Sequence, residues 1–367
     1  MKRNMQFAHK YKHSIYSSRA ANTLSRKDKK YVEVRNKQIH NIGNTRIIKA
    51  PDFLSIYSVD EKYKTFHPFK ETLAFKNNLI KTIGSHNCII DFSNTKSFTA
   101  GAMVYLFAQI QSIKNLSKYK IELAWSKESK YVNRIIKRSG LPKLCRTGNP
   151  IENLSSVRSL PVVNGVGIQH YAQIMDFIQR RYYKDEMDPE IEFKIGDALS
   201  ETLNNVGRHA YPGLDNKEKN WWMICDVIGD QLYLCIYDSG VGIPRTVVEK
   251  TWFLTSYEKT YPEEYATLKK EVGSVLDKVK LVTLNMFQDH QLIYLSMMGD
   301  VSGTKQKKHG QGSKSIKALV SDTNGGKLWV YSNNGLYKYE DGDKSPQVYK
   351  LPSEISGTLI QWNIKIG

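Results

Sequence analysis

The residues best suited to chemistry by type and spacing lie in the stretch 199–211. Glu201, Asn205 and His209 follow one another at four-residue intervals inside a pattern of helical period. Side chains four residues apart lie on one face of a helix, so the spacing predicts a carboxylate, a carboxamide and an imidazole side by side. A carboxylate accepts protons and a carboxamide offers an oxygen to a cation, so this helix is a candidate reaction site.

Two glycine-rich turns follow this helix along the chain. Residues 238–244 read Asp-Ser-Gly-Val-Gly-Ile-Pro, and residues 310–315 read Gly-Gln-Gly-Ser-Lys-Ser. Glycine allows the backbone to pass close to a bound molecule. The second turn opens a predicted helix, whose free N–H groups and positive dipole end suit phosphates. This order of parts indicates a nucleotide site.

A predicted hairpin holds the first of these turns. Residues 222–227 and 232–237 have the composition of two strands, and Gly-Asp at residues 229–230 is a hairpin signal between them. The second strand delivers Asp238 at its end.

The rest of this half of the chain predicts a long insertion and a closing pair of strands. Residues 245–309 contain apolar helical pieces and separate the two glycine-rich turns. Residues 326–339 are expected to form a hairpin that turns at 333–335, and residues 357–362 to form a final strand.

The N-terminal half predicts a smaller α/β unit. The apolar run 88–92 and the run 121–125 have the composition of buried strands, and the segment from residue 100 to 113 between them has helical period. This is a βαβ pattern. Further helices are expected over 72–83 and 131–138, and the second should stop near the following Gly-Leu-Pro.

Length and composition fit a two-domain protein outside the membrane. The chain has 367 residues and no run near the roughly 18 apolar residues that a membrane span needs. The first residues lack the apolar core of a secretory signal. The cysteines lack metal-ligand spacing and are expected to be reduced, three of them in buried strands. The four cysteines are Cys88, Cys145, Cys225 and Cys235. These features together predict a cytoplasmic location.

The net charge of +18 is concentrated at the N-terminus. Residues 1–50 hold thirteen Lys or Arg against Asp28 and Glu33, a net charge of +11, which leaves +7 for the rest of the chain. An arm of this composition, with few large apolar residues, is expected to lack stable structure unless an anionic partner orders it. Nucleic acid and an acidic protein are both candidate partners, and a tail that only aids solubility is the simpler alternative.

The helix and the turns together resemble the GHKL ATPases, the superfamily of gyrase, the Hsp-type chaperones, the MutL mismatch-repair proteins and the histidine kinases. The match covers roughly residues 190–367 and includes four boxes in the family's order, the last being the Gly-Thr pair at 357–358. The box with the second glycine-rich turn departs from the kinases, which have Leu where Ser313 stands. The resemblance implies a Bergerat-fold α/β sandwich that binds ATP and Mg²⁺.

The resemblance assigns a role to each box. Glu201 would activate a water molecule, and Asn205 would ligate Mg²⁺. Asp238 would accept the adenine amino group. His209 would approach phosphate or pack at the helix end, and both readings stay open. The remaining residues expected to contact the nucleotide are Arg208, Gly240, Gly242, Gly310, Gly312, Ser313, Lys314 and Thr358.

The N-terminal unit resembles the STAS domains of anti-sigma factor antagonists, which run strand, turn, helix and strand in the same way. Thr99 stands where those domains carry a phosphorylated serine, but Phe98 replaces the Asp that precedes it. A hydroxyl residue directly before a helix is also a good N-cap. We therefore expect Thr99 to cap the helix.

These observations predict an α/β protein in four parts: a basic arm over 1–45, a STAS-like domain over 46–145, a linker over 146–165 and a GHKL domain over 166–367 with its lid at 245–309. The leading hypothesis is a regulatory ATPase in which lid closure on ATP controls an unidentified protein partner. One alternative is a serine/threonine kinase of the anti-sigma type. Another is a nucleic-acid-associated ATP switch that binds through the arm. Homodimer formation on closure also stays open.

Overall fold

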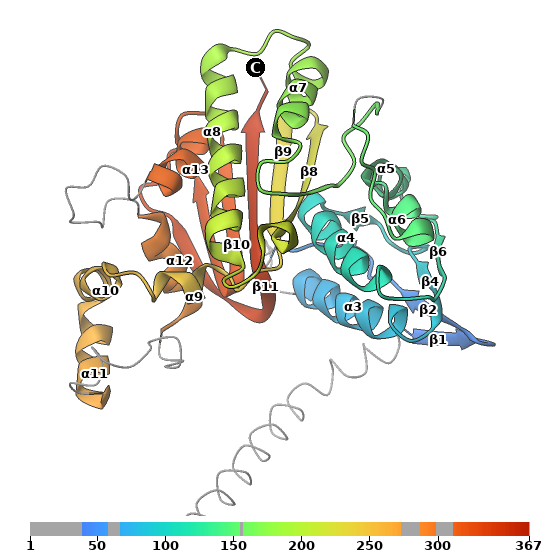
Figure 1. The fold of residues 1–367 in the computed structure, drawn as a ribbon, viewed down its shortest axis with the longest axis horizontal. Helices are drawn as coiled ribbons and strands as arrows, with labels where there is room; N and C mark the ends of the chain where they lie inside the picture. The colour runs from blue at the N-terminus through green and yellow to red at the C-terminus, as the bar shows by residue number, and fades with distance from the viewer. Residues whose placement is uncertain (1–38, 58–66, 155–156, 273–286, 299–310, 367) are drawn as a thin grey trace, which may run out of the picture.

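The protein is an α/β structure with two main sheets (Figure 1). The computed structural model describes residues 39–57, 67–154, 157–272, 287–298 and 311–366. Most of the predicted arm, Gly310 and parts of the predicted lid lie outside these residues. We call residues 39–147 the N-terminal unit and residues 163–366 the C-terminal unit.

The N-terminal unit contains the predicted βαβ pattern. Its main sheet has the strand order β1-β2-β4-β6, in which β1 is antiparallel to β2, and β2, β4 and β6 are parallel. Parallel neighbours need a crossover, and helix α4 supplies it between β4 and β6. The strands are β1 (Ile39–Ile42), β2 (Thr45–Lys49), β4 (Asn87–Asp91) and β6 (Ile121–Ala124), with a separate pair β3 (Phe53–Leu54) and β5 (Ser97–Phe98).

Four helices pack with this sheet: α3 (His67–Ile83), α4 (Ala100–Lys114), α5 (Lys130–Ser139) and α6 (Leu141–Thr147). Thr99 caps α4, since its hydroxyl accepts the N–H of Ala102 at 3.4 Å. Gly140 ends α5 with φ +80°, as the sequence predicts. The chain does not stop being helical there, because Pro142 occupies the first turn of α6, where a missing N–H costs nothing.

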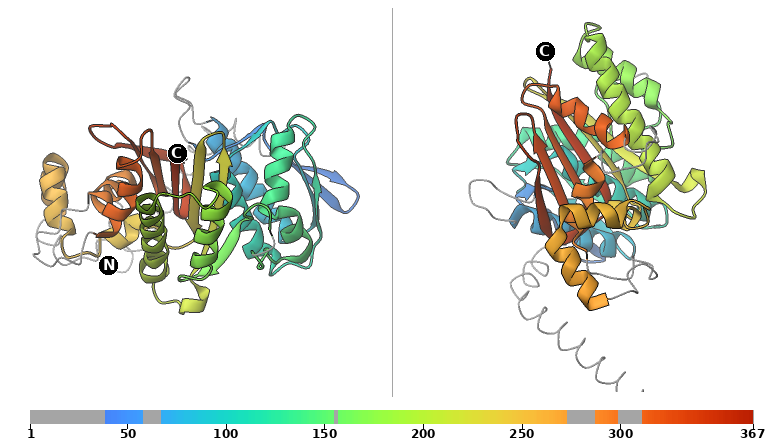
Figure 2. Two further views of the ribbon diagram at one scale, coloured as in Figure 1. Left: turned by 90° about the horizontal axis from the view of Figure 1, so that it is seen from above. Right: turned by 90° about the vertical axis from the view of Figure 1, so that its left-hand side faces the viewer.

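The C-terminal unit is an antiparallel sheet with helices on one face. The strand order is β10-β11-β9-β8-β7, and β8 and β9 form the hairpin predicted at residues 229–230. Figure 2 shows α7, α8 and α13 together on one side of this sheet. The elements are β7 (Val163–Val166), α7 (Tyr171–Tyr182), α8 (Pro189–Asn205), β8 (Asn220–Ile228), β9 (Gln231–Asp238), α13 (Gln311–Ser321), β10 (Lys327–Glu340) and β11 (Gln347–Lys365).

The insertion between the glycine-rich turns is helical where the structure describes it. Its helices are α9 (Ile243–Val247), α10 (Phe253–Thr260), α11 (Pro262–Val272) and α12 (Asp289–Met297). Phe253, Tyr257 and Leu292 belong to an apolar cluster of their own. Met297 is buried.

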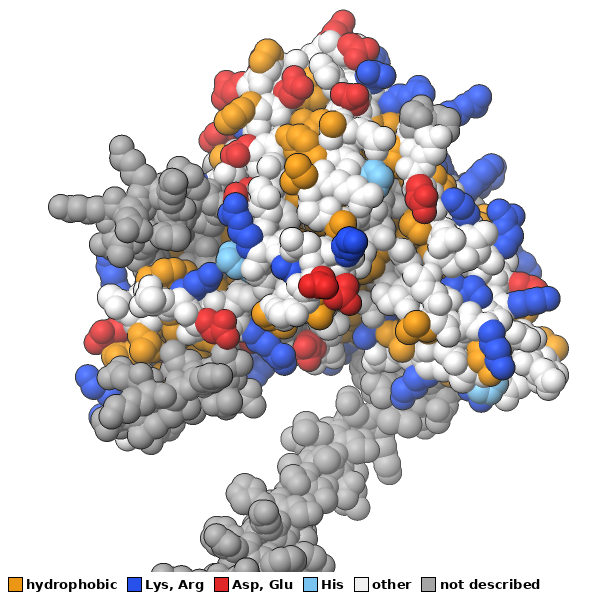
Figure 3. All heavy atoms as spheres, viewed as in Figure 1, with side chains coloured by type: hydrophobic (Ala, Val, Ile, Leu, Met, Phe, Trp, Pro, Cys, Tyr) orange, Lys and Arg blue, Asp and Glu red, His pale blue; other side chains and the backbone are white. Residues whose placement is uncertain are grey.

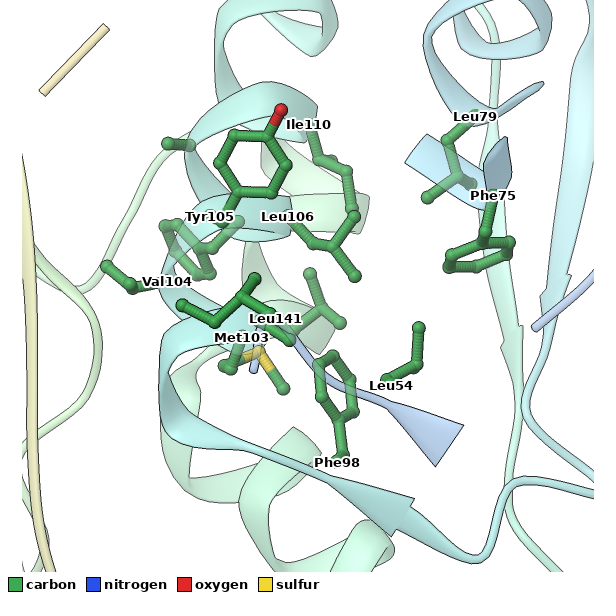
Figure 4. Packing of buried hydrophobic residues seen from close by; sticks show 14 of the residues in the cluster. Leu54, Phe75, Leu79, Phe98, Met103, Val104, Tyr105, Leu106, Ile110 and Leu141 are labelled. Carbon is green, nitrogen blue, oxygen red and sulfur yellow. The ribbon is translucent and has the colours of Figure 1, made fainter. Parts of the chain in front are cut away.

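The two units share one hydrophobic core. Alternation along β8 points Trp221 toward α8 and Trp222 toward the N-terminal unit, and both rings are buried. The cluster around Trp222 also contains Tyr237 and Leu359 from the sheet and most of α4. Figure 4 shows the apolar side chains that α4 contributes to this cluster, among them Met103, Tyr105 and Leu106. Helix α4 is therefore a layer between two sheets.

The hairpin predicted at residues 333–335 is wrong. β10 runs through this Asn-Asn-Gly sequence to Glu340, with register shifts at Ser332, Asn333 and Gly335 that form a bulge. The backbone of Gly335 lies against α12, where an added Cβ would meet the N atom of His290 at 2.7 Å. Glycine is needed at residue 335 because β10 and α12 approach each other closely there, and not because the chain turns. The chain reverses after Glu340 instead.

Both ends of the N-terminal unit differ from the predicted ranges. β1 begins at Ile39, within the range assigned to the arm. Helix α6 extends to Thr147 and β7 begins at Val163, within the range assigned to the linker. All the cysteines are free and buried. Among the described helices, none is long and apolar enough to cross a bilayer.

Candidate functional site

Helix α8 places the first predicted residues. Asp188 caps it by accepting the N–H of Glu190 at 2.7 Å, and Pro189 occupies its first turn. Its buried face, which includes Leu199 and Leu203, packs on the sheet with Trp221. The opposite face and the C-terminal end carry the polar residues. Figure 3 shows acidic side chains at the upper end of this face, near the start of α8, and a further acidic group near the middle of the view.

The regular helix ends at Asn205 and continues as a π-helical turn over Val206–Ala210. A π turn is wider than an α turn and is often found at functional sites. The carboxamide of Asn205 lies close enough to Glu201 to influence its carboxyl, as their spacing on one helix face predicts. The positive group beside Glu201 is Arg208, whereas His209 lies near Lys250, after α9. Arg208 therefore joins Glu201 and Asn205 at this end of the helix, whereas His209 faces a different neighbour.

The surroundings of the helix end shift the pKa values of Glu201 and His209. Burial raises the pKa of Glu201 above its ordinary value, and the charge of Arg208 and the carboxamide of Asn205 partly offset this. The pKa of His209 is lowered because the ring is partly shielded from water and because Lys250 and Arg208 place positive charge beside it. His209 is therefore neutral at physiological pH, and Glu201 is a stronger base than an exposed glutamate.

Asp238 lies at the end of β9, and only 6% of its surface is exposed. Burial raises the pKa of this carboxyl to about 7. One of its oxygens accepts the backbone N–H of Gly240 at 2.9 Å, and the backbone of Thr358, opposite in the register of β9 and β11, also favours the ionised form. Such a buried carboxylate, held by backbone donors, has acceptor capacity left for a further donor.

The fold requires glycine at residues 240 and 242, because a larger residue at either position would collide with neighbouring parts of the protein. A Cβ on Gly240 would lie 2.2 Å from the carbonyl oxygen of Ala210, which accepts the N–H of Val241 at 2.8 Å. Gly242 has φ +85°, and a Cβ there would lie 2.6 Å from Oδ1 of Asn333. The loop after Asp238 is thus pressed against the end of the π turn. Their predicted contact with a nucleotide stays a prediction.

Ser332 joins two of the motifs, although the sequence offers no signal for it beyond a Ser in a strand. Its hydroxyl donates to the carbonyl of Gly357 at 3.0 Å and lies 3.2 Å from the hydroxyl of Thr358. It also accepts the N–H of Ile243 at 2.9 Å. Gly357 itself has φ +85°, and an added Cβ would lie 2.0 Å from the carbonyl oxygen of Asp238. The Gly-Thr pair and the loop after Asp238 are therefore one packed structure.

Tyr211 fixes the same loop from the other side. Its hydroxyl accepts the N–H of Ser239 at 2.9 Å and donates to the carbonyl of Asn220 at 2.6 Å. Burial, with the charge of Asp238 nearby, raises the pKa of Tyr211 to about 12. The phenol stays neutral and keeps both bonds over the physiological range of pH.

Helix α13 begins at the second glycine-rich turn, as predicted. An ion pair of 3.2 Å joins Lys194, near the start of α8, to Asp322, just after α13. The two helices pack together, and equal numbers of residues separate Lys194 from Asn205 and Asp322 from Gln311. Hence α13 runs antiparallel to α8, and its positive N-terminal end lies level with Asn205. Its first turn contains Gly312, Ser313 and Lys314; Gly310 lies outside the described residues.

The residues present suit a magnesium ion that is bound mainly through a ligand. No group of three or more His, Cys, Asp or Glu side chains able to hold a metal occurs in the described parts of the chain. Mg²⁺ commonly takes one or two protein oxygens and completes its shell with phosphates and water. The single carboxamide oxygen of Asn205, beside Glu201, matches this mode.

A cavity of about 1030 Å³ lies elsewhere, on the face of the five-stranded sheet that α8 does not cover. It is lined by Tyr57 and Thr99 of the N-terminal unit and by Tyr233, Trp329 and Asn363 of the sheet, among others. Of the predicted site residues, none contributes to its lining. Its volume suits a small molecule, but the motifs meet on the other face, so it is not the candidate nucleotide site.

Comparison of the chain with protein-family models gives no match, and comparison with curated proteins gives none either. The functional argument therefore rests on the motifs and on the geometry in which they meet.

Proposed function

We propose that this chain is an ATP- and Mg²⁺-binding regulatory ATPase of the GHKL type, with a Bergerat-fold C-terminal unit and a STAS-like N-terminal unit. The observation that carries the proposal is the contact between the loop after Asp238 and the end of α8, where Val241 donates to Ala210 at 2.8 Å. Through it, a buried carboxylate, a polar helix end and a glycine-rich loop lie together. These are the parts that a purine nucleotide with a cation requires.

Asp238 would recognise the base. Its ionised carboxylate accepts the adenine amino group, while Gly240 and Thr358 hold the carboxylate in place. A buried acceptor of this kind discriminates strongly, because a base without the amino group leaves the carboxylate unpaired. Thr358 and Ser332 fix the adjacent backbone.

The other end of the site would hold the phosphates. When bound, Mg²⁺ neutralises phosphate charge and orients the γ-phosphate, with Asn205 as its protein ligand. The first turn of α13 directs N–H groups and Lys314 toward the same end, and Arg208 adds positive charge. Glu201 orients the attacking water and takes its proton, for which its raised pKa is suited.

The insertion supplies the regulatory part of the proposal. α9 begins directly after Gly242, and the helices that follow pack around Phe253 and Leu292. A movement of this lid on nucleotide binding would change the surface that a protein partner meets. The buried, reduced cysteines fit the proposed cytoplasmic location.

The kinase alternative has less support. Thr99 caps α4 and borders the cavity on the face away from α8, so phosphoryl transfer to Thr99 within one chain would require the two units to separate. Its test is phosphopeptide mapping after incubation with ATP. The nucleic-acid alternative rests on the arm, which lies outside the described residues. Its test is whether salt-dependent binding disappears on deletion of residues 1–38.

The main experiment measures ATP binding and turnover on four proteins. Asp238→Asn should lose about hundredfold in ATP affinity, since a charge-assisted hydrogen bond is removed. Glu201→Gln should keep binding and lose at least about hundredfold in turnover. Glu192→Gln, in the first turn of the same helix, is the control and should match the wild type. Unchanged ATP affinity in Asp238→Asn, or no ATP binding by the wild type, would refute the site.

A further inference from the structure

We infer that helix α4 of the N-terminal unit sets the nucleotide affinity of the C-terminal unit. It does so by holding Tyr237, which directly precedes Asp238, and through Tyr237 the backbone of Ser356 in the neighbouring strand. The inference rests on the proposed function. It goes beyond it by placing residues that position the adenine site in a different structural unit.

Helix α4 lies directly against the strands that end at the site. It is buried nearly all round: Ala100 to Ala108, Ile110 and Gln111 are all buried. A helix with apolar residues on every side must be covered on every side. α3 and α6 cover part of it, and strands β8, β9 and β11 cover the rest.

Polar contacts cross this apolar layer at defined points. Nε2 of Gln109 donates to the hydroxyl of Tyr237 at 3.0 Å, and that hydroxyl donates to the carbonyl of Ser356 at 2.9 Å. The ring of Tyr105 meets that of Tyr237 edge-on, with centroids 5.2 Å apart. A few hydrogen bonds within a buried apolar contact fix the position of α4 relative to β9 and β11, because breaking one leaves a buried polar group without a partner.

The residues that α4 holds are the immediate neighbours of the proposed adenine site. Tyr237 precedes Asp238, and Ser356 precedes Gly357 and Thr358. Because Gly357 lies against the carbonyl of Asp238 and Thr358 is its register partner in β11, a shift of Ser356 moves the backbone that packs on Asp238. Burial keeps the pKa of Tyr237 well above its ordinary value, so the hydroxyl remains a donor at physiological pH.

A second inter-unit bond provides a matched control. Arg138 of α5 pairs with Asp226 of β8 at 3.5 Å. Asp226 lies opposite Tyr233 in the β8–β9 register, whereas Asp238 lies opposite Trp221, at the other end of the hairpin. Arg138→Ala therefore removes a contact between the same two units without touching the site.

The experiment is ATP titration by calorimetry on the full chain, together with amide hydrogen exchange of the protein without nucleotide. Tyr237→Phe and Gln109→Leu should each weaken ATP binding roughly threefold to thirtyfold, the range of coupling effects from residues that do not touch a ligand. Exchange at the amides of Gly240 and Thr358 should accelerate in both variants. Arg138→Ala should change neither quantity.

The outcomes separate the inference from the proposed function. If the wild type binds ATP and the two variants bind it equally well, the inference is refuted and the proposed function stands. An equal loss of affinity in Arg138→Ala would also refute it, because the effect would then be general loosening. Failure of the wild type to bind ATP refutes the proposed function; the hydrogen-exchange comparison then still decides whether α4 orders the backbone around Asp238.

Discussion

At the scale of single residues, Asp238 has the property most open to measurement. Its pKa of about 7 in the folded chain compares with an ordinary value of 3.8. A carboxyl whose pKa is raised by folding remains protonated in the folded chain while the unfolded chain has already lost its proton. Ionisation of this group therefore opposes folding progressively as the pH rises from about 4 to about 7.

The same carboxyl predicts a pH dependence of binding. The adenine amino group needs the ionised acceptor, so ATP affinity should rise by about tenfold between pH 6 and pH 8. Calorimetric titration at both pH values measures this. Adenosine should show the same trend and serves as the control, because it carries no phosphate that titrates in this range. Equal affinities for adenosine at pH 6 and pH 8 would contradict the assignment.

Gly240 gives a second test at this scale. Gly240→Ala should destabilise the fold by about 1–3 kcal/mol and weaken ATP binding, since its Cβ would lie 2.2 Å from the carbonyl oxygen of Ala210. Gly207→Ala, in the adjoining π turn, has nothing within 4 Å of the added Cβ and an ordinary φ. Thermal unfolding and ATP titration of both variants should show a loss only for Gly240→Ala. A loss in both would point to the helix rather than to the contact.

At the scale of elements, the start of α4 is set by Thr99. Thr99→Ala removes the N-cap and should cost about 1 kcal/mol of stability, whereas Thr99→Ser keeps the hydroxyl and should cost little. Chemical denaturation measures both. ATP affinity should be the same in the two variants and the wild type. A large loss of turnover in Thr99→Ala that Thr99→Ser does not share would instead favour the kinase alternative, in which this hydroxyl is the acceptor.

The same scale shows why one predicted element was wrong. Asn-Asn-Gly at residues 333–335 is a strong local signal for a hairpin turn. In the fold, Asn333 donates to the carbonyl of Val241 at 3.1 Å and the N–H of Asn334 binds the carboxylate of Asp289 at 2.9 Å. These partners are distant in sequence. They make a bulge within β10 more favourable than a turn at its middle.

At the scale of the whole molecule, the shared core predicts a single cooperative unfolding transition. A chain of residues 160–367 would expose Trp222, Tyr237 and Leu359, which the N-terminal unit buries. It should aggregate or bind a hydrophobic dye rather than fold, since large exposed apolar faces do not persist in monomers. A chain of residues 39–367 retains every described element and is the control. A folded, monomeric 160–367 chain would contradict the shared core.

The sequence by itself determined the elements that depend on local patterns. The βαβ unit, the hairpin at residues 229–230, the amphipathic helix of Glu201 and the position of Asp238 at a strand end all follow from period and turn residues, because such signals lie within a few residues of one another. Pairing of Glu201 with Asn205 follows from one helical turn.

Only the tertiary structure decided which distant groups meet. The bonds of Ser332, the contact of Gly240 with Ala210, the antiparallel packing of α13 on α8 and the bond from Gln109 to Tyr237 join residues far apart in the chain. No local pattern encodes them, because each depends on how buried surfaces fit across layers. The candidate site was therefore predictable as a set of residues, whereas its support from a second structural unit was not.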